Sequence, residues 1–371
     1  MNNKKQQLLG KNTRMKTPTN LSEITSEWLT YILAQEGHIQ CSKVSGIKAR
    51  IIGGGNNFLS TVVHVLLEYD RRERNAPNSL VVKLEPTSPR LRNITAETHA
   101  FEREIRFYQE VAPFAPIRLP RCYYAAIDPP NYLLVIEDLT FAVSGDQVAG
   151  LHAEQVLETA RLMGRLQGKY WNNDALANLT WMPTTNRRFW SNFDSLWDSF
   201  LENYDGLLEK SSRQLGDKLR GKTKWLEDEI ESRPRTIVHS DLRADNILVG
   251  PPGTPESIII LDWQLAIRSI GAFDVARMMG GSELPDERHG HQLDVLHAWF
   301  DGICESDIDY SWEDALYDLR LGALITFCWS VQFYNEYANS QGRTKKLIQC
   351  MSERTFDSAV EMDAGRVLPT N

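Results

Sequence analysis

Cysteine is scarce and scattered in this chain of 371 residues. The count is odd, and no two cysteines form a C-x-x-C pair: Cys41, Cys122, Cys304, Cys328 and Cys350. Disulfide-rich secreted domains and structural zinc sites need paired or clustered cysteines. We therefore expect neither, and the sequence favours a reducing compartment, which we take to be the cytoplasm.

Long hydrophobic runs are also missing. The longest mostly apolar stretch, residues 321–333, is shorter than the roughly 20 residues that a membrane-spanning helix needs. The polar start of the chain, residues 1–7, is not followed by the apolar core of a secretory signal. These absences predict no membrane partner, and we expect residues 1–20 to form a mobile leader.

Positive charge is in deficit, since the formal net charge is −8 and the isoelectric point is near 5.6. Proteins that bind nucleic acid through its phosphates carry a basic surface, so this balance disfavours a nucleic-acid partner. Apolar residues make up 42% and charged residues 24%, which is ordinary for a globular protein. The length suffices for two lobes with a substantial core.

A glycine-rich loop joins two strand-like segments within residues 44–69, but it lacks the Gly-Lys-Ser/Thr ending of a Walker A loop. Glycines let backbone N–H groups come close to phosphate oxygens, and a nest of such groups binds anions. The candidates for phosphate binding are Gly54, Gly55, Asn57 and Ser60. The alternative is an ordinary hairpin turn, which Gly and Asn also form.

A polar loop between two short apolar runs, within residues 237–249, carries the clearest chemistry. The pattern predicts a strand, a tight loop and a second strand. Asp241 stands five residues before Asn246, and a later apolar run ends on Asp262. We expect the strands to deliver these three side chains, together with His239, towards one place.

This set of residues suits phosphoryl transfer. Transfer needs a nucleophile held in line and neutralised phosphate charge, usually by Mg²⁺, which takes hard oxygen ligands and keeps several waters. Asn246 and Asp262 are the candidate metal ligands, and Asp241 is the candidate acceptor of a proton from a substrate hydroxyl. The spacing follows the protein-kinase template. Alone it would indicate only a turn, but His239 and the flanking strands favour a kinase-like site.

A lysine interrupts the apolar strand pattern of residues 79–84. If Lys83 is buried it must find a partner, because an unpaired buried ammonium is unfavourable; the alternative is an edge strand whose lysine faces water. In the kinase template such a lysine bridges the α- and β-phosphates and pairs with a helix glutamate. We predict a helix over residues 95–111, in which Glu104 is preferred to Glu102 as the partner.

These residues resemble the aminoglycoside-phosphotransferase and choline-kinase-like superfamily of small-molecule kinases, most closely its ecdysteroid-kinase-like branch. The resemblance is carried by His239-Ser240-Asp241 with Asn246, by Leu261-Asp262-Trp263-Gln264, and by residues 55–60, 101–108 and 136–139. It runs through most of the chain, and the substrate-facing part is its least specific portion.

The resemblance implies an α+β fold of the bilobal protein-kinase type. A small lobe with an antiparallel sheet, residues 1–139, would bind the nucleotide, and a larger, mostly helical lobe, residues 140–371, would carry catalysis and the acceptor. Backbone groups around Glu137 and Leu139 would form the hinge that meets the adenine edge. The implied cofactors are ATP and Mg²⁺.

The resemblance also implies roles in the second lobe. Asp241 would orient or deprotonate the acceptor hydroxyl, and Arg243 would either stabilise charge on the migrating phosphoryl group or make a surface ion pair. Asp274 looks like the structural aspartate that ties its helix to the catalytic loop. Trp329 and Tyr334 are weak candidates for substrate contact, with plain packing as the alternative.

The chain departs from the family pattern at two positions. Gln167-Gly168 stands where related kinases often have His-Ala, which leaves the role of that position open. Ser240 stands where they often have glycine, and we expect no loss of activity from this change.

Residues 171–205 are dense in aromatic side chains, which predict a core between helices or, alternatively, a box for a cationic ligand. They are Trp171, Trp181, Phe189, Trp190, Phe193, Trp197, Phe200 and Tyr204.

The sequence therefore predicts an ATP-dependent kinase that transfers the γ-phosphate to a hydroxyl of a metabolite or antibiotic. One alternative is a catalytically inactive, kinase-like binding protein. A Ser/Thr protein kinase is disfavoured, because no Asp-Phe-Gly or Ala-Pro-Glu segment frames an activation loop. The sequence does not select the acceptor, ATP over GTP, or an oligomeric state.

Overall fold

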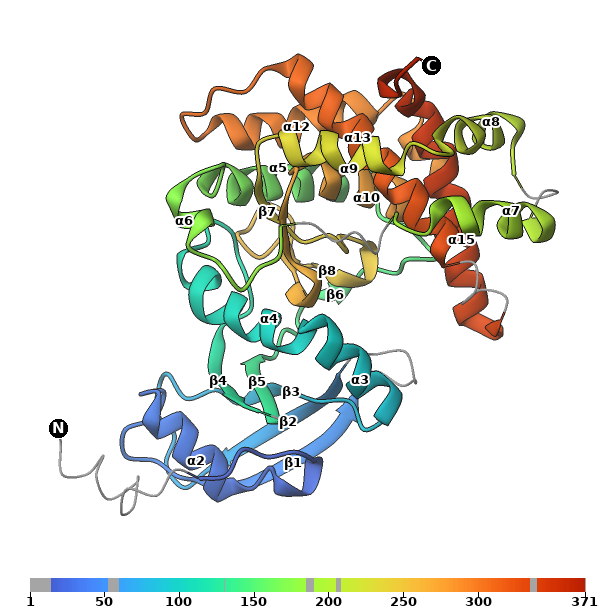
Figure 1. Cartoon of the computed structure of the whole chain (residues 1–371). Coiled ribbons are helices and arrows are strands. Elements are labelled where there is room, and N and C mark those ends of the chain that lie inside the picture. Colours follow the sequence, from blue (N-terminus) through green and yellow to red (C-terminus); the bar gives the residue numbers. More distant parts are fainter. Residues whose placement is uncertain are drawn as a thin grey trace. The chain divides into compact units, whose positions relative to one another are not determined.

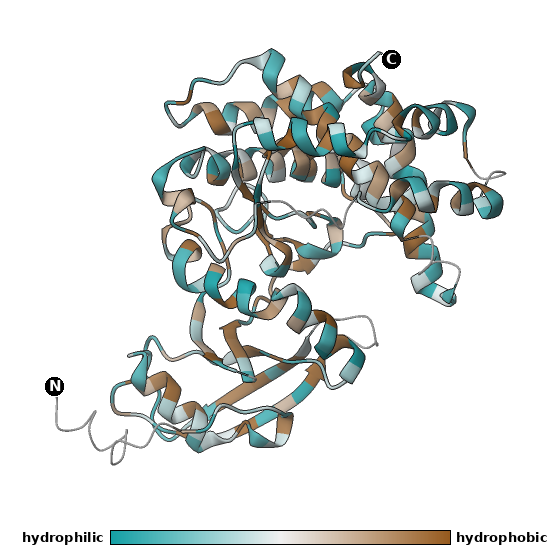
Figure 2. Cartoon of the chain, in the orientation of Figure 1, coloured by the Kyte–Doolittle hydropathy of each residue, from teal (hydrophilic) through white to brown (hydrophobic). Residues whose placement is uncertain are grey.

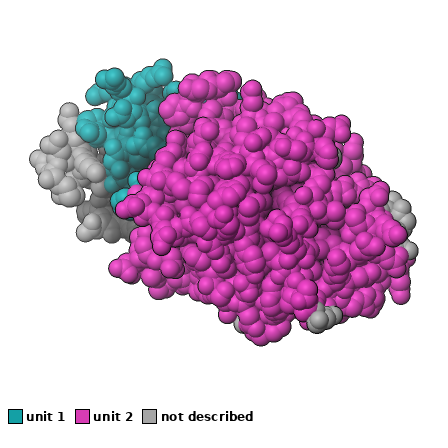
Figure 3. All heavy atoms as spheres, turned by 90° about the horizontal axis from the view of Figure 1, so that it is seen from above, with its two compact units in different colours: residues 1–115, 119–141, 262–264 teal, residues 116–118, 142–261, 265–371 magenta. Residues whose placement is uncertain are grey.

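The computed structural model of the protein describes residues 15–52, 60–129, 131–184, 190–204, 208–333 and 339–370. Four predicted site residues, Gly54, Gly55, Asn57 and Tyr334, lie outside these ranges. The chain divides into two compact units (Figure 3). Unit 1 comprises residues 1–115, 119–141 and 262–264, and unit 2 comprises residues 116–118, 142–261 and 265–371.

Unit 1 is built on a five-stranded sheet in which every neighbouring pair is antiparallel. The strand order is β1-β2-β3-β5-β4, with β1 Val44–Ile52, β2 Thr61–Tyr69, β3 Ser79–Leu84, β4 Cys122–Asp128 and β5 Asn131–Glu137. Figure 2 shows hydrophobic residues along these strands. The two strands predicted within residues 44–69 and the strand predicted over residues 79–84 are confirmed as β1, β2 and β3.

Helix α2, Ser26–Gln35, covers one face of this sheet. Its Trp28, Leu29 and Ile32 belong to the same buried cluster as Val63 and Val82 of the sheet. The helical spacing of apolar residues in the sequence also predicts this helix, but with a start near Ser22, which is wrong. Residues 21–23 form a separate 3-10 turn, and Thr25 caps α2 by accepting a hydrogen bond from the Trp28 N–H.

The single helix predicted over residues 95–111 is also wrong. Helix α3 begins earlier, at Pro89, and ends at Thr98; α4 follows as Ala100–Arg106, and residues 107–111 form a π-helical turn. His99 separates the two helices because its φ of 51° is left-handed, which interrupts the helical hydrogen bonding. Pro89 suits the new start, where its missing N–H costs no hydrogen bond.

Unit 2 is mostly helical, as expected, and Figure 1 labels most of its helices. They are α5 Ala153–Lys169, α6 Asp174–Ala177, α7 Phe193–Tyr204, α8 Lys210–Leu219, α9 Thr223–Ser232, α10 Ala272–Ser282, α11 Pro285–Arg288, α12 Gln292–Cys304, α13 Trp312–Gln332 and α15 Gly342–Glu361. No helix in the part of the chain that the structure describes is long and apolar enough to cross a membrane.

Helix α10 occupies the interior of unit 2, since all of its residues are buried. It packs against α13 and α15. A Cβ added at Gly322 of α13 would lie only 2.9 Å from the Cα of Phe273, so this glycine lets α10 and α13 approach closely. This close packing lets side chains of α13 contact those of α10, as Trp329 does with Arg277.

Short strands hold the predicted catalytic loop. Strand β7, Thr236–Val238, pairs with β10, Ile267–Ser269, whereas β8, Ile247–Val249, pairs with β9, Ile258–Ile260, and β6, Val143–Ser144. Residues 239–246 therefore connect two separate small sheets, both within unit 2.

The aromatic residues of α7 form core. Phe193, Trp197, Phe200 and Tyr204 are buried and stack in sequence along the helix. Trp197 also donates from Nε1 to Asp217 across 2.9 Å, so its one polar atom is satisfied. The prediction that this cluster packs between helices is confirmed for these four residues.

Candidate active site

Lys83 stands at the centre of a buried charge cluster in unit 1. Strand β3 lies between β2 and β5, so the alternative of an edge-strand lysine is excluded. Leu80, Val82 and Leu84 face the core beneath α2, and because side chains alternate along a strand, Lys83 faces the other side of the sheet. Only 8% of Lys83 is exposed.

The partner of Lys83 is Glu104 of α4. The Lys83 Nζ donates to both carboxylate oxygens of Glu104 at 2.7 Å and to Oδ1 of Asp262 at 3.0 Å. The competing residue, Glu102, pairs instead with Arg106 across 2.8 Å. The predicted choice of Glu104 over Glu102 is confirmed.

Burial and neighbouring charges shift the pKa values of this cluster in opposite directions. Burial alone would lower the pKa of Lys83, but the carboxylates of Asp262 and Glu104 outweigh it and raise the pKa, so the lysine stays protonated. Burial raises the pKa of Glu104 to about 7, against the opposing charge of Lys83. The cluster thus keeps a protonated ammonium group buried in unit 1.

Asp262 is held in an uncommon backbone conformation. Its φ of 66° is left-handed, a region that residues other than glycine rarely adopt and that often occurs at functional sites. Its Oδ2 accepts a hydrogen bond of 3.0 Å from Nε2 of Gln264. The adjacent Trp263 stacks flat on Phe107, with 4.0 Å between ring centroids, which anchors the segment in unit 1.

The predicted hinge residues lie at the end of β5. A side-chain oxygen of Glu137 accepts a hydrogen bond of 3.0 Å from the backbone N–H of Arg121, and Leu139 is buried. Between them, Asp138 lies 2.8 Å from Nε2 of His64, a pair that the sequence did not predict. Ser60 directly precedes β2. Contacts of these residues with a nucleotide stay predictions.

In unit 2 the predicted catalytic loop, residues 239–246, is held by the carboxylate of Asp274. The backbone N–H groups of His239 and Ser240 each donate to Asp274 at 2.8 Å. Burial raises the pKa of Asp274 to about 7, although these donors act to lower it. His239 hydrogen bonds through Nε2 to the carbonyl of Leu261 at 2.7 Å. The first arrangement agrees with the structural role that the resemblance implied for Asp274, and the second shows His239 as a hydrogen-bonding residue of the loop.

Gln167 takes part in the same network, which answers the question raised by its departure from the family pattern. Its Nε2 donates to Asp274 at 3.0 Å, and its Oε1 accepts from Nε1 of Trp299 at 2.6 Å. Its backbone carbonyl accepts from Thr236 at 2.6 Å. Gly271 leaves room for the amide, because a Cβ there would lie 2.7 Å from Oε1.

Both carboxylate oxygens of Asp241 accept hydrogen bonds. Its Oδ2 accepts from Nε of Arg243 at 3.1 Å and from Nδ2 of Asn246 at 3.3 Å. Its Oδ1 accepts from Nη2 of Arg277 at 3.0 Å. Burial acts to raise the pKa of Asp241, but the charges of Arg243 and Arg277 outweigh it and lower the pKa. Arg243 also pairs with Asp245 of the same loop, and its role towards a phosphoryl group stays a prediction.

Arg277 is the residue of this group that the sequence analysis missed. It lies in α10, is 3% exposed, and places its Cζ 4.5 Å from the centre of the Trp329 ring. The available signal was an arginine within a mostly apolar helical segment, three residues after Asp274. Trp329 is largely buried and packs against this arginine, and its contact with an acceptor stays a prediction.

The oxygen atoms of Asn246 and Asp262 suit a hard cation. The amide nitrogen of Asn246 is engaged with Asp241, and within the described ranges no donor reaches its amide oxygen. Groups of three or more His, Cys, Asp or Glu side chains fit to hold a metal are absent from those same ranges. Mg²⁺ in phosphoryl-transfer sites needs only one or two protein oxygens, so each of these side chains by itself offers suitable donor chemistry, and the binding of Mg²⁺ stays a prediction.

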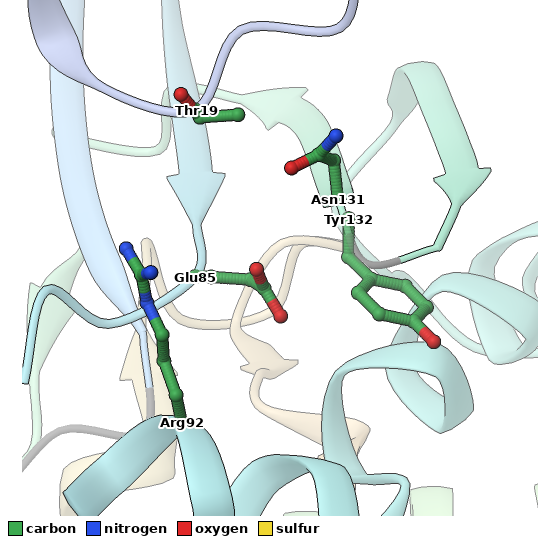
Figure 4. Close-up of a pocket in the computed structure, with 5 residues that line it drawn as sticks. All are labelled: Thr19, Glu85, Arg92, Asn131 and Tyr132. Atoms are coloured by element: carbon green, nitrogen blue, oxygen red, sulfur yellow. The ribbon is translucent and has the colours of Figure 1, made fainter. Parts of the chain in front are cut away.

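A small pocket of about 170 Å³ lies elsewhere in unit 1. Figure 4 shows the Glu85 side chain between those of Arg92 and Tyr132, with Thr19 and Asn131 completing the lining. None of the predicted site residues lines this pocket, so we assign it no part in the chemistry.

Known structures share the fold. Choline kinase from Cryptosporidium parvum Iowa II matches 87% of this chain and 92% of its own, with a TM-score of 0.53 and 10% identity. A GDP and kanamycin complex of APH(2″)-IIIa matches 90% and 98%, with a TM-score of 0.52 and 14% identity. A GDP complex of a mutant aminoglycoside 2′-phosphotransferase-IIIa matches 90% and 97%, with a TM-score of 0.50 and 14% identity.

Sequence comparison gives the family. No curated protein matches the chain significantly. The sequence profile of the ecdysteroid kinase-like family matches residues 54–306, a segment that includes Lys83, Glu104, Asp241, Asn246 and Asp262. Because the match covers more than half of the chain, this protein belongs to the ecdysteroid kinase-like family.

Proposed function

We propose that this protein is a small-molecule kinase that transfers the γ-phosphate of ATP to a hydroxyl group. The observation that carries the proposal is the buried cluster of Lys83, Glu104 and Asp262 in unit 1. A buried ammonium held by two carboxylates is a costly arrangement for stability alone. It has a clear use where phosphate charge must be bound.

In this proposal unit 1 binds the nucleotide. Lys83 contacts the α- and β-phosphates, and Glu104 keeps its Nζ in place. The loop that contains Gly54, Gly55 and Asn57, together with Ser60, covers the phosphates with its backbone N–H groups. Backbone groups near Glu137 and Leu139 meet the adenine edge.

Asn246 and Asp262 are the residues that would hold Mg²⁺ in this proposal, each through a side-chain oxygen. When bound, the ion would neutralise charge on the β- and γ-phosphates. The chain contributes the orientation of both oxygens. Asn246 is fixed by its hydrogen bond to the Asp241 carbonyl at 2.9 Å, and Asp262 by Lys83 and Gln264.

Asp241 orients the acceptor hydroxyl and takes its proton. A bond forms between the acceptor oxygen and the γ-phosphorus while the bond from that phosphorus to the β–γ bridging oxygen breaks, which releases ADP. Arg243 stabilises negative charge on the migrating group. Asp274 and Gln167 keep the loop that carries Asp241 rigid.

The acceptor is a hydroxylated small molecule, either a metabolite or an antibiotic. The solved structures with this fold include a choline kinase and a complex with kanamycin, and they differ in the acceptor they take. In this chain Trp329 and Tyr334 are the candidate acceptor contacts that the resemblance implies.

Thermal unfolding with and without ATP and Mg²⁺ tests the nucleotide site. A ligand that binds only the folded state stabilises it by about 2.7 kcal/mol at a hundredfold excess over Kd. We expect a Mg²⁺-dependent rise in Tm that is lost in Asp262→Ala. The matched control is Asp301→Ala, an exposed aspartate of α12, which should keep the full rise. No rise with ATP or GTP in the native protein would refute the proposal.

A further inference from the structure

Arg277 is a charged residue in the interior of unit 2. Every residue of α10 is buried, and only 3% of Arg277 is exposed. A buried guanidinium is unfavourable unless its charge and its N–H groups are matched. Its partners are therefore informative about why it is there.

Two partners hold the guanidinium, and both belong to the predicted site. The Trp329 ring of α13 lies beneath it, with 4.5 Å from Cζ to the ring centre, a favourable cation–π geometry. Nη2 donates to Oδ1 of Asp241 at 3.0 Å. Arg277 thus links the interior packing of two helices directly to the carboxylate of the catalytic loop.

The two carboxylate oxygens of Asp241 accept different numbers of hydrogen bonds. Oδ2 accepts from Arg243 and Asn246, whereas among the described residues only Arg277 donates to Oδ1. A carboxylate offers about four lone-pair sites, two on each oxygen. Oδ1 is therefore the oxygen with a lone pair left for an acceptor hydroxyl, and Arg277 sets the position of that oxygen.

We propose that Arg277 is a positioning residue that fixes Oδ1 of Asp241 for the acceptor hydroxyl, and that Trp329 acts by supporting Arg277. This inference deepens the proposed kinase function and rests on it. It assigns Trp329 a role through Arg277 instead of a direct substrate contact. It also predicts that loss of Arg277 slows the transfer step and leaves nucleotide binding unchanged.

The kinetic test uses ATP turnover with water in place of the acceptor hydroxyl, so that no acceptor need be known. A misplacement of a reacting group by about 1 Å lowers rates by about a hundredfold. We expect Arg277→Met to lower kcat by about this factor with KM for ATP within about twofold. Arg277→Lys should recover part of kcat, because an ammonium still donates to Oδ1.

Trp329 gives a second pair of variants. Trp329→Phe keeps an aromatic face under the guanidinium and should retain most of kcat. Trp329→Leu removes that face and should lower kcat towards the value of Arg277→Met, again with KM for ATP unchanged. Equal kcat values in the two Trp329 variants would overturn the supporting role of this ring.

Arg233 provides the matched control. It too lies over an aromatic ring, that of Tyr317, and bonds to two aspartates, Asp314 and Asp318, in a separate network. Arg233→Met should lower Tm yet leave kcat within about twofold. If Arg277→Met does no more to kcat than Arg233→Met does, the inference is overturned.

A double-mutant cycle tests the contact without any catalysis. Asp241→Asn and Arg277→Met should be coupled in the unfolding equilibrium by about tenfold or more, because the two groups bond directly. Asp241→Asn combined with Arg233→Met should show no coupling. An uncoupled Asp241–Arg277 pair would refute the inference.

The experiments distinguish a failure of the proposed kinase function from a failure of the positioning role of Arg277. A protein with no ATP-dependent rise in Tm refutes the proposed function, and the positioning role falls with it. A protein that binds and turns over ATP, but whose kcat is unchanged in Arg277→Met, refutes the positioning role alone.

Discussion

The side-chain amide of Gln167 donates to Oδ2 of Asp274 across 3.0 Å, and Asp274 in turn holds the backbone of the catalytic loop. The other end of the same amide accepts from Trp299. Gln167 thus connects α5, α12 and α10 at one buried point. A glutamine satisfies this geometry fully because one amide group supplies both a donor and an acceptor.

This relationship predicts a large loss of stability in Gln167→Leu. The change leaves the Trp299 N–H without an acceptor and removes one donor from Asp274, so we expect a loss of about 2–4 kcal/mol in the free energy of unfolding. Urea denaturation measures it. Gln155→Leu in the same helix is the control, since Gln155 only caps the helix start and should cost about 1 kcal/mol or less. Similar losses in the two variants would contradict the bridging role.

Lys83→Met should abolish nucleotide binding and also destabilise the fold. The variant leaves buried Glu104 without its partner, at a cost of about 3–5 kcal/mol. In the double variant Lys83→Met with Glu104→Leu both charges are gone, so stability should largely return while the ATP-dependent rise in Tm stays absent. A rise in Tm with ATP in the double variant would show that Lys83 does not bind phosphate.

Two substitutions of Ser240 distinguish the effect of backbone strain on stability from the effect of a lost hydrogen bond. Its φ is 62°, and its hydroxyl donates to the carbonyl of Leu265. Ser240→Ala loses the bond and keeps the strain, whereas Ser240→Gly loses the bond and relieves the strain. We expect the Gly variant to be about 1 kcal/mol more stable than the Ala variant in urea denaturation. The reverse order would show that the left-handed conformation is not strained here.

His38 makes the stability of unit 1 depend on pH. Burial and the nearby Arg121 lower the pKa of His38 below its usual value of about 6.5. The unfolded chain therefore binds more protons in acid, so stability is full above about pH 6.5 and falls as the pH drops below it. Because the ring is partly exposed, we expect a loss of about 1 kcal/mol or less.

Denaturation of the native protein and of His38→Gln between pH 7.5 and about 5 checks this prediction. Glutamine does not titrate in this range, so the variant should show a shallower fall in stability. Identical pH slopes would rule out a contribution from His38.

The fold was largely predictable because its signals are local. Apolar runs bounded by turn residues located the first strands of unit 1, and both ends of β3 were predicted at the residues where the structure has them. Helix boundaries were less predictable. The residues around His99 give no local signal for its left-handed conformation. That conformation depends on how α3 and α4 pack. The Ser22 start failed because Asn20 and Thr25 are both good caps, and the second one starts the helix.

The site was predictable where a residue breaks a local pattern. Lys83 interrupts an apolar strand, and this marked it and its partner Glu104. Arg277 and Gln167 were harder, because an arginine or glutamine on a helix usually faces water, and their partners are distant in sequence. The catalytic and metal-binding roles of Asp241, Arg243, Asn246 and Asp262 stay predictions.

The most direct test of the kinase function is transfer of label from γ-labelled ATP to a panel of alcohols. The panel should include neutral polyols, sterols, amino alcohols, aminoglycosides and macrolides. We predict a labelled product with at least one alcohol, and a loss of about a thousandfold or more in Asp241→Asn, which removes the proton acceptor but keeps the side-chain shape. Nucleotide binding without any transfer, or equal transfer by Asp241→Asn, would contradict this account and favour a kinase-like binding protein.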